Sequence, residues 1–186
     1  MAAIPAAATA AVRKYFPPSV QATALAIAGA ETGWTLEPSR VDVAAGRPYT
    51  CPADSPVPAP FSFGGWQVSL EYYAPIIPGR DMCQKAAYLL ASWDNSARIA
   101  AAVWRGRGDF GAWSTWWTDA ADHVGPGEGS YLAYLPAAQQ ALGQAVTATA
   151  PAATTVTPVP AGGGGLGGLG VPLELLAGAL LLEEVL

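Results

Sequence analysis

The strongest structural signal in the sequence lies in residues 20–33, which read VQATALAIAGAETG. The run from Val20 to Glu31 is rich in alanine, leucine and isoleucine, which is typical of a buried helix. Two prolines and Ser19 precede it and supply a helix stop followed by an N-cap. Gly33 supplies a C-terminal break, because glycine readily adopts the left-handed conformation that ends helices. We therefore predict a core helix that ends at Gly33.

Glu31 occupies the last turn of this predicted helix, on its apolar face. The residues three and four positions before it are Ala28 and Ile27, so the carboxyl group projects from the apolar stripe. The C-terminal end of a helix also disfavours negative charge. Both effects raise the pKa of a carboxyl group, as a general acid that works near neutral pH requires. The alternative is that the helix frays before Glu31 and leaves its side chain in solvent.

The rest of the first 146 residues predicts a mainly α-helical domain. Residues 81–90 and 95–104 have helical character, and residues 131–146 predict a last helix. Glu37–Pro60 is rich in proline and shows no sustained period, so we predict a long loop there. Residues 61–70 contain paired glycines, which indicate a tight turn or a small β-hairpin where the backbone approaches another group closely.

The composition changes abruptly after the predicted domain, residues 1–146. Residues 147–170 change from Ala, Thr and Pro to a glycine tract, which is typical of a flexible linker. Residues 171–186 are leucine-rich, but they contain three glutamates and fall short of the roughly 20 apolar residues of a membrane span. We therefore predict no transmembrane span and a short helical tail that docks on another protein. The tail residues with helical spacing are Leu173, Leu176, Ala177 and Leu180.

Charge and residue types exclude several classes of function. The net charge of −5 argues against nucleic acid as a partner, because affinity for phosphates comes largely from Lys and Arg. His123 is the only histidine, which excludes a multi-histidine metal site and a histidine-based triad, and we expect it at the surface or in a loop. We expect no metal and no cofactor. Cys51 and Cys83 permit one disulfide bond, and two small buried thiols are an equally good alternative.

Three blocks of sequence resemble one enzyme family. Residues 26–33 (AIAGAETG) resemble the end of the catalytic helix of soluble lytic transglycosylases and goose-type lysozymes, where a glutamate precedes a small hydroxyl residue and glycine. Residues 62–68 (SFGGWQV) resemble their second motif, a Ser-x-Gly-x-x-Gln turn that lines the sugar cleft. Residues 95–101 (NSARIAA) and 108–116 (GDFGAWSTW) resemble the corresponding end of related phage virion lysins. The blocks follow the family's order and the resemblance covers residues 19–117.

The resemblance implies a lysozyme-like fold with a small β-hairpin at the cleft. It also implies cleavage of the MurNAc-GlcNAc bond in peptidoglycan glycan strands, with Glu31 as the general acid and base. In such a site, Ser62 and Gln67 position the sugar by hydrogen bonds, and the backbone of Gly64 and Gly65 lies close to it. These residues, with Trp66, are the expected substrate-binding residues.

The number of carboxylates distinguishes two reactions. Ordinary glycoside hydrolysis uses a pair of carboxylates, and we expect the nearest candidates, Glu71 and Asp94, to be surface charges. The resemblance implies that Glu31, once deprotonated, activates the C6 hydroxyl of the substrate itself and yields a 1,6-anhydro sugar. We therefore expect transglycosylation, with hydrolysis as the alternative.

The sequence departs from the family at several points. Gly65 stands where the family usually has a larger apolar residue, and no Ala-Tyr-Asn motif supplies a tyrosine near the acid, a place that Tyr72 or Tyr73 could take. Of the tryptophans, we expect Trp66 alone to line the cleft, because aromatic faces pack against sugar rings. We assign the cluster that begins at Trp113 to the core.

Two classes of protein fit these observations. The first is a peptidoglycan-cleaving enzyme carried in the tail or interior of a phage virion, which acts on the bacterial cell wall during entry. This location fits the first 11 residues, which match a secretory signal poorly, and a tail that docks on another virion protein. A secreted or periplasmic enzyme is the alternative. The second class is a catalytically inactive structural or sugar-binding virion protein with the same fold. The intact Glu31 favours the enzyme.

Overall fold

The computed structural model describes residues 3–38, 62–119 and 122–145. They belong to the first of two compact units, Met1–Val146 and Thr147–Leu186. Most of the predicted long loop, and the whole of the predicted linker and tail, lie outside the described residues and stay predictions. No helix among the described residues is long and apolar enough to cross a membrane.

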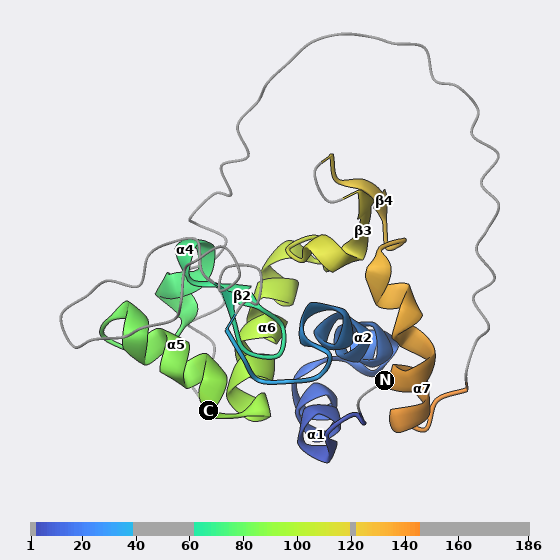
Figure 1. Cartoon of the computed structure of the whole chain (residues 1–186), viewed down its shortest axis with the longest axis horizontal. Helices are drawn as coiled ribbons and strands as arrows, with labels where there is room; N and C mark the ends of the chain where they lie inside the picture. Colours follow the sequence, from blue (N-terminus) through green and yellow to red (C-terminus); the bar gives the residue numbers. More distant parts are fainter. Residues whose placement is uncertain (1–2, 39–61, 120–121, 146–186) are drawn as a thin grey trace, which may run out of the picture. The chain divides into compact units, whose positions relative to one another are not determined.

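The first unit is mainly α-helical, as the sequence predicts (Figure 1). Its α-helices are α1 (Ala6–Tyr15), α2 (Gln21–Thr32), α4 (Leu70–Tyr73), α5 (Met82–Ala91), α6 (Trp93–Arg107) and α7 (Leu135–Ala141). Its 3-10 turns are η1 (Pro18–Val20), η2 (Ala74–Ile76), η3 (Ser114–Trp116) and η4 (Ser130–Ala133). Two antiparallel hairpins pair β1 (Ser62–Phe63) with β2 (Val68–Ser69), and β3 (Trp117–Asp119) with β4 (Val124–Pro126).

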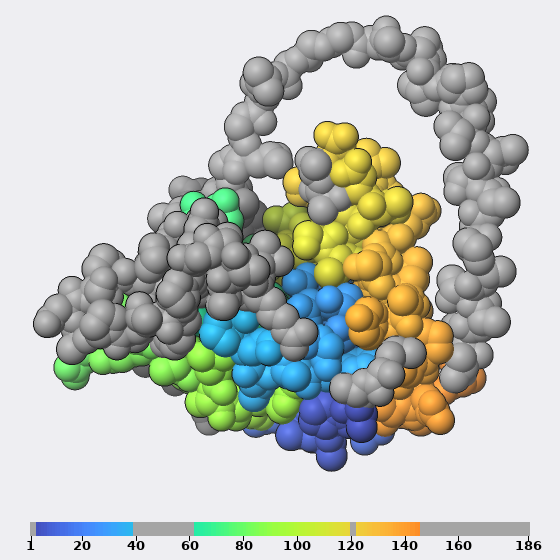
Figure 2. Space-filling view, in the orientation of Figure 1, coloured from blue at the N-terminus to red at the C-terminus, as the bar shows by residue number. Residues whose placement is uncertain are grey.

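Helix α2 is the central helix of this unit and contacts α1, α7 and η4. Leu25, Ile27 and most of its alanines are buried. A Cβ atom on Gly29 would lie 2.7 Å from the rings of Trp34 and Tyr134, so the close packing on this face requires glycine. In Figure 2, the blue part of the chain, which ends at residue 38 and includes α2, lies between the green and the orange parts of the unit. Glu31 is therefore held by a helix that neighbours surround.

The C-terminal end of α2 is as predicted, and its start differs. Gly33 has a φ of 65° and donates its backbone N–H to the carbonyl of Gly29 at 2.7 Å, which confirms the helix stop. At the start, Ser19 is not the N-cap, because it lies inside η1 and no side chain caps α2. Pro17 is the N-cap residue of η1 and Pro18 is its first residue, a position where the N–H group has no intrahelical partner.

The remaining helices confirm most of the predicted pattern. Helix α5 has the predicted length but is shifted by one residue, and α6 extends beyond the predicted segment at both ends. Asp81 and Ser92 are their N-cap residues, and both side chains accept backbone N–H bonds. The predicted last helix is instead divided into η4 and α7. Pro136 explains the break, because proline has no backbone N–H to donate and is tolerated only in the first turn of a helix, where α7 places it. Helix α7 ends at Ala141, before the predicted end at residue 146. Helix α1, which packs on α6, was not predicted.

The β1–β2 hairpin confirms the predicted turn in residues 61–70. Ser62 pairs with Ser69, and Phe63 pairs with Val68. The β3–β4 hairpin was not predicted, because each strand has only three residues and the strands have no regular alternation of buried and exposed side chains.

An aromatic cluster joins three parts of the chain: the end of α1, the β1–β2 turn and the segment that leads into η3. Phe16 lies 6.1 Å from Trp66 and 6.2 Å from Phe110, measured between ring centroids. Phe110 also contacts Trp113 and Trp116, at 5.8 and 5.6 Å. Packed rings of this kind bury a large apolar area. The cluster thereby anchors the segment that runs into η3 in the core of the unit.

Candidate active site

Glu31 lies in the last turn of α2, partly buried. Burial raises the pKa of its carboxyl group from 4.5 to about 6, although hydrogen bonds from Thr115 act in the opposite direction. The hydroxyl of Thr115 donates to Oε1 of Glu31 at 2.8 Å. The direction of this shift is the one that the sequence predicts, and burial is its main cause. Glu31 is therefore a carboxyl group that changes its protonation state near neutral pH.

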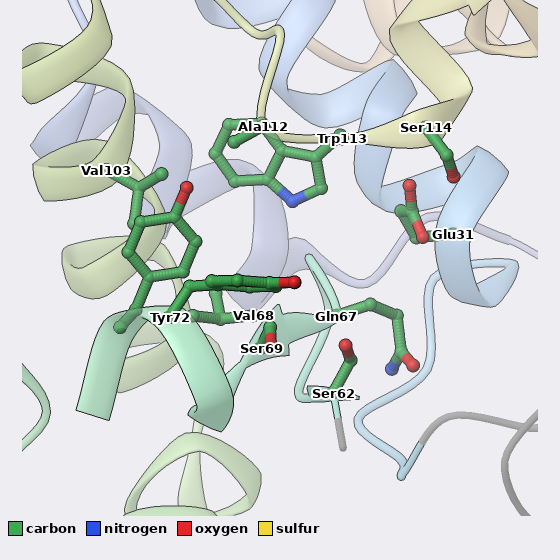
Figure 3. A pocket seen from close by; sticks show the side chains of 11 residues that line it. Glu31, Ser62, Gln67, Val68, Ser69, Tyr72, Val103, Ala112, Trp113 and Ser114 are labelled. Carbon is green, nitrogen blue, oxygen red and sulfur yellow. The ribbon is translucent and has the colours of Figure 1, made fainter. Parts of the chain in front are cut away.

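A cleft of about 320 Å³ opens beside Glu31. Figure 3 shows Glu31 on one side of this cleft and Val103 on the other, with Trp113 and Ala112 above and Ser62 and Ser69 below. The lining residues are Glu31, Ser62, Gln67, Val68, Ser69, Tyr72, Tyr73, Val103, Ala112, Trp113 and Ser114. This mixture of apolar surface and a few polar groups is typical of a small-molecule or sugar site.

The structure brings two of the predicted substrate-binding residues, Ser62 and Gln67, together with Glu31. Gln67 has a φ of 47°, in the left-handed region that non-glycine residues seldom adopt. Its side-chain Nε2 donates to the backbone carbonyls of Glu37 and Gly64, each at 2.9 Å. Because the amide hydrogens are used within the protein, Oε1 is the atom of Gln67 that suits a hydrogen-bond donor on a ligand.

The predicted role of Gly64 and Gly65 is wrong. Both residues are buried and neither lines the cleft. Their close contacts are internal: a Cβ atom on Gly65 would collide with the ring of Trp93, and the N–H of Gly65 donates to Oγ of Ser96 at 3.0 Å. The paired glycines do mark a close backbone approach, as predicted. The groups that they approach belong to α5 and α6, so the approach is internal packing.

The predicted role of Trp66 is also wrong. Its side chain is fully buried, and its Nε1 donates to the carbonyl of Ala24 at 2.8 Å. Trp66 is a core residue because α1 and α6 cover its ring through Phe16 and Trp93. Trp113 belongs to the core, as the sequence predicts, because only 4% of its surface is exposed, and it also forms part of the cleft wall.

Several residues of the site were not assigned a role from the sequence. Thr115 and Ser114 belong to a block that resembles virion lysins, but nothing in the one-dimensional pattern indicated that Thr115 contacts Glu31, 84 residues away. Tyr72 and Tyr73 were candidates for a tyrosine near the acid, and both line the cleft. The hydroxyl group bonded to Glu31, however, comes from Thr115.

No family model, curated protein or solved structure matches this chain.

Glu31 is the one carboxylate among the described residues that line the cleft. Glu71 is exposed on α4. Asp94 forms an ion pair with Lys14 at 2.8 Å and accepts a hydrogen bond from the hydroxyl of Tyr15 at 2.7 Å. Both residues thus occupy positions of the kind expected for surface charges.

Among the described residues, the other candidates for special chemistry do not line the cleft. Residues 3–38, 62–119 and 122–145 contain no group of three or more His, Cys, Asp or Glu side chains that could hold a metal ion. His123 is exposed at the β3–β4 turn, where its ring contacts Trp117. Cys83 is disulfide-bonded, and Cys51 lies outside the described residues.

Proposed function

We propose that this protein cleaves the MurNAc-GlcNAc bond of peptidoglycan strands, with Glu31 as the general acid and base of a lytic transglycosylase. The observation that carries the proposal is the placement of Glu31, with a pKa of about 6, at a cleft that Ser62 and Gln67 also line. A lysozyme-like fold, of which the helical unit and the β1–β2 hairpin at the cleft are the coarse features, belongs to the same proposal.

The chemistry requires one group that gives and then takes a proton. Protonated Glu31 donates its proton to the glycosidic oxygen while the bond from that oxygen to C1 of MurNAc breaks. The resulting carboxylate accepts the proton of the C6 hydroxyl as O6 forms a bond with C1. The products are a 1,6-anhydro sugar and a free 4-hydroxyl on GlcNAc, and Glu31 ends protonated as it began. No water is consumed.

Three features of the cleft support this assignment. A pKa near 6 leaves a useful fraction of Glu31 in each protonation state near neutral pH. The described lining residues supply no second carboxylate, which ordinary two-carboxylate hydrolysis requires. The side chains of Tyr72 and Tyr73 provide aromatic surface for the apolar faces of sugar rings.

Digestion of purified peptidoglycan with mass analysis of the released muropeptides tests the proposal. We expect 1,6-anhydro products from the wild type and none from Glu31→Gln, which keeps the shape of the side chain but cannot donate the proton. Glu71→Gln is the matched control, because it removes an exposed carboxylate that does not line the cleft.

Two results contradict the proposal in different ways. Reducing-end products that carry an added water would show hydrolysis and overturn the transglycosylase assignment alone. A wild type that cleaves none of several wall types would favour an inactive structural or sugar-binding protein. The proposed setting is a phage virion, in which the tail, residues 171–186, would dock on another virion protein at the end of the linker, residues 147–170.

A further inference from the structure

We propose that Thr115 is a positioning residue for Glu31, whose hydroxyl orients the carboxyl group so that the acid proton resides on Oε2. The inference rests on the proposed function and extends it to a residue that contacts the acid rather than the glycan. Its starting point is the 2.8 Å hydrogen bond from Oγ1 of Thr115 to Oε1 of Glu31. The backbone of Thr115 also acts on the same carboxyl group as a hydrogen-bonding partner.

The turn that carries Thr115 is held in place from several directions. The ring of Trp116, the next residue, stacks on Tyr131 with ring centroids 5.2 Å apart. The carbonyl of Trp116 accepts the backbone N–H groups of Gly127 and Gly129, each at 3.1 Å. Gly129 lies so close to the backbone of Thr115 that a Cβ atom there would collide with it. The position of Thr115 is therefore set by the fold and does not depend on its bond to Glu31.

A fixed donor on one carboxyl oxygen has two consequences. Because Oε1 of Glu31 accepts from Thr115, the neutral acid is best accommodated with its proton on Oε2, since a carbonyl oxygen is the better acceptor. The same donor favours the ionised form, which is the base in the second half of the reaction. The hydroxyl of Thr115 thus holds Oε1 of Glu31, which favours Oε2 as the oxygen that gives and takes the proton.

Other charged groups do not change the pKa of Glu31. Burial and Thr115 account for the pKa of Glu31. Titratable side chains also lie on the elements that pack against α2 or line its cleft. They are Arg13, Lys14 and Tyr15 on α1, Glu71, Tyr72 and Tyr73 on α4, Asp94, Arg98, Arg105 and Arg107 on α6, Tyr131 on η4, and Tyr134 directly before α7. None of them contributes to the shift at Glu31, so a change in the titration of Glu31 on substitution of Thr115 reports the hydrogen bond itself.

The test compares Thr115→Val, which keeps the branched shape and removes the donor, with Thr115→Ser, which keeps the donor. We measure kcat and KM on soluble glycan fragments across pH, and titrate the Glu31 carboxyl by carbon-13 NMR, with Glu31→Gln used to assign the signal. For Thr115→Val we expect kcat to fall about tenfold or more with little change in KM. We also expect the pKa of Glu31 and the alkaline limb of activity to move up by about one pH unit.

Thr115→Ser should behave like the wild type in both measurements. Thr118→Val is the matched control, because Thr118 is exposed on β3 and its hydroxyl donates to the carbonyl of Glu128, away from Glu31. If Thr115→Val does not fold, Thr115→Ala takes its place as the variant without a donor.

The positioning role is overturned if the variant without the hydroxyl leaves the titration of Glu31 unchanged, or if Thr115→Ser loses as much kcat as Thr115→Val. A wild type that cleaves no glycan, while the titration still moves in Thr115→Val, refutes the proposed function and supports the contact. The NMR measurement thus separates the failure of one proposal from the failure of the other.

Discussion

Substitution of Glu31 by glutamine is expected to make the protein more stable at neutral pH while it removes activity. The pKa of Glu31 rises from 4.5 in an ordinary setting to about 6 in the fold, so the folded state binds the proton more tightly than the unfolded state. The stabilising contribution of this proton is fully present below pH 4.5 and is lost as the pH rises through 6. The glutamine side chain of the Glu31→Gln variant carries no charge at any pH, so the variant has no such loss.

The magnitude follows from the two pKa values. At 1.36 kcal/mol for each pH unit, the difference corresponds to about 2 kcal/mol in the free energy of unfolding above pH 7. This is an upper value, because solvent in the cleft screens the charge. In a unit of this size, about 2 kcal/mol shifts the melting temperature by about 4–8 °C. The wild type and Glu31→Gln should therefore melt together near pH 4 and diverge as the pH rises.

Thermal melts of both proteins from pH 4 to pH 8, followed by circular dichroism, measure this difference. Glu71→Gln is again the control, because that exposed side chain should give no such divergence. A Glu31→Gln protein that is less stable than the wild type at pH 8 would refute the reasoning, since Glu31 would then make stabilising bonds that outweigh its burial. A gain in stability that is equal at pH 4 and pH 8 would exclude ionisation as its cause.

Three other perturbations test the fold and the site. Gly65→Ala should lower the free energy of unfolding by about 1–3 kcal/mol, because its Cβ would collide with Trp93; denaturant melts should show a larger loss than for Gly33→Ala, where only the positive φ is strained. Gln67→Ala should raise KM for soluble glycan about tenfold with a smaller change in kcat, if Oε1 holds the substrate; an unchanged KM would remove Gln67 from binding. Deletion of residues 162–186 should leave cleavage of soluble glycan unchanged and abolish incorporation into a larger assembly, whereas loss of cleavage would show that the tail belongs to the catalytic unit.

Local sequence patterns were sufficient for the features that depend on neighbours in the chain. The apolar run up to Glu31 and the glycine at position 33 predict both the buried helix and its end, because a helix places residues three and four apart on one face and glycine tolerates the left-handed conformation. The same periodicity predicts the elevated pKa of Glu31, since a carboxyl group on an apolar face is desolvated. The glycine pair predicts a hairpin with a close backbone approach.

Long-range packing decided the features that the pattern could not supply. A glycine pair requires a close neighbour but does not name it, and the fold brings Trp93 and Ser96 of α6 against Gly65 where a sugar was expected. Trp66 is buried because Phe16, directly after α1, and Trp93 of α6 cover its ring. The hydrogen bond between Thr115 and Glu31 spans 84 residues and exists only because the aromatic core brings η3 against the end of α2. A sequence specifies which groups can form such contacts, but the pairing of distant groups depends on how all the elements pack at once.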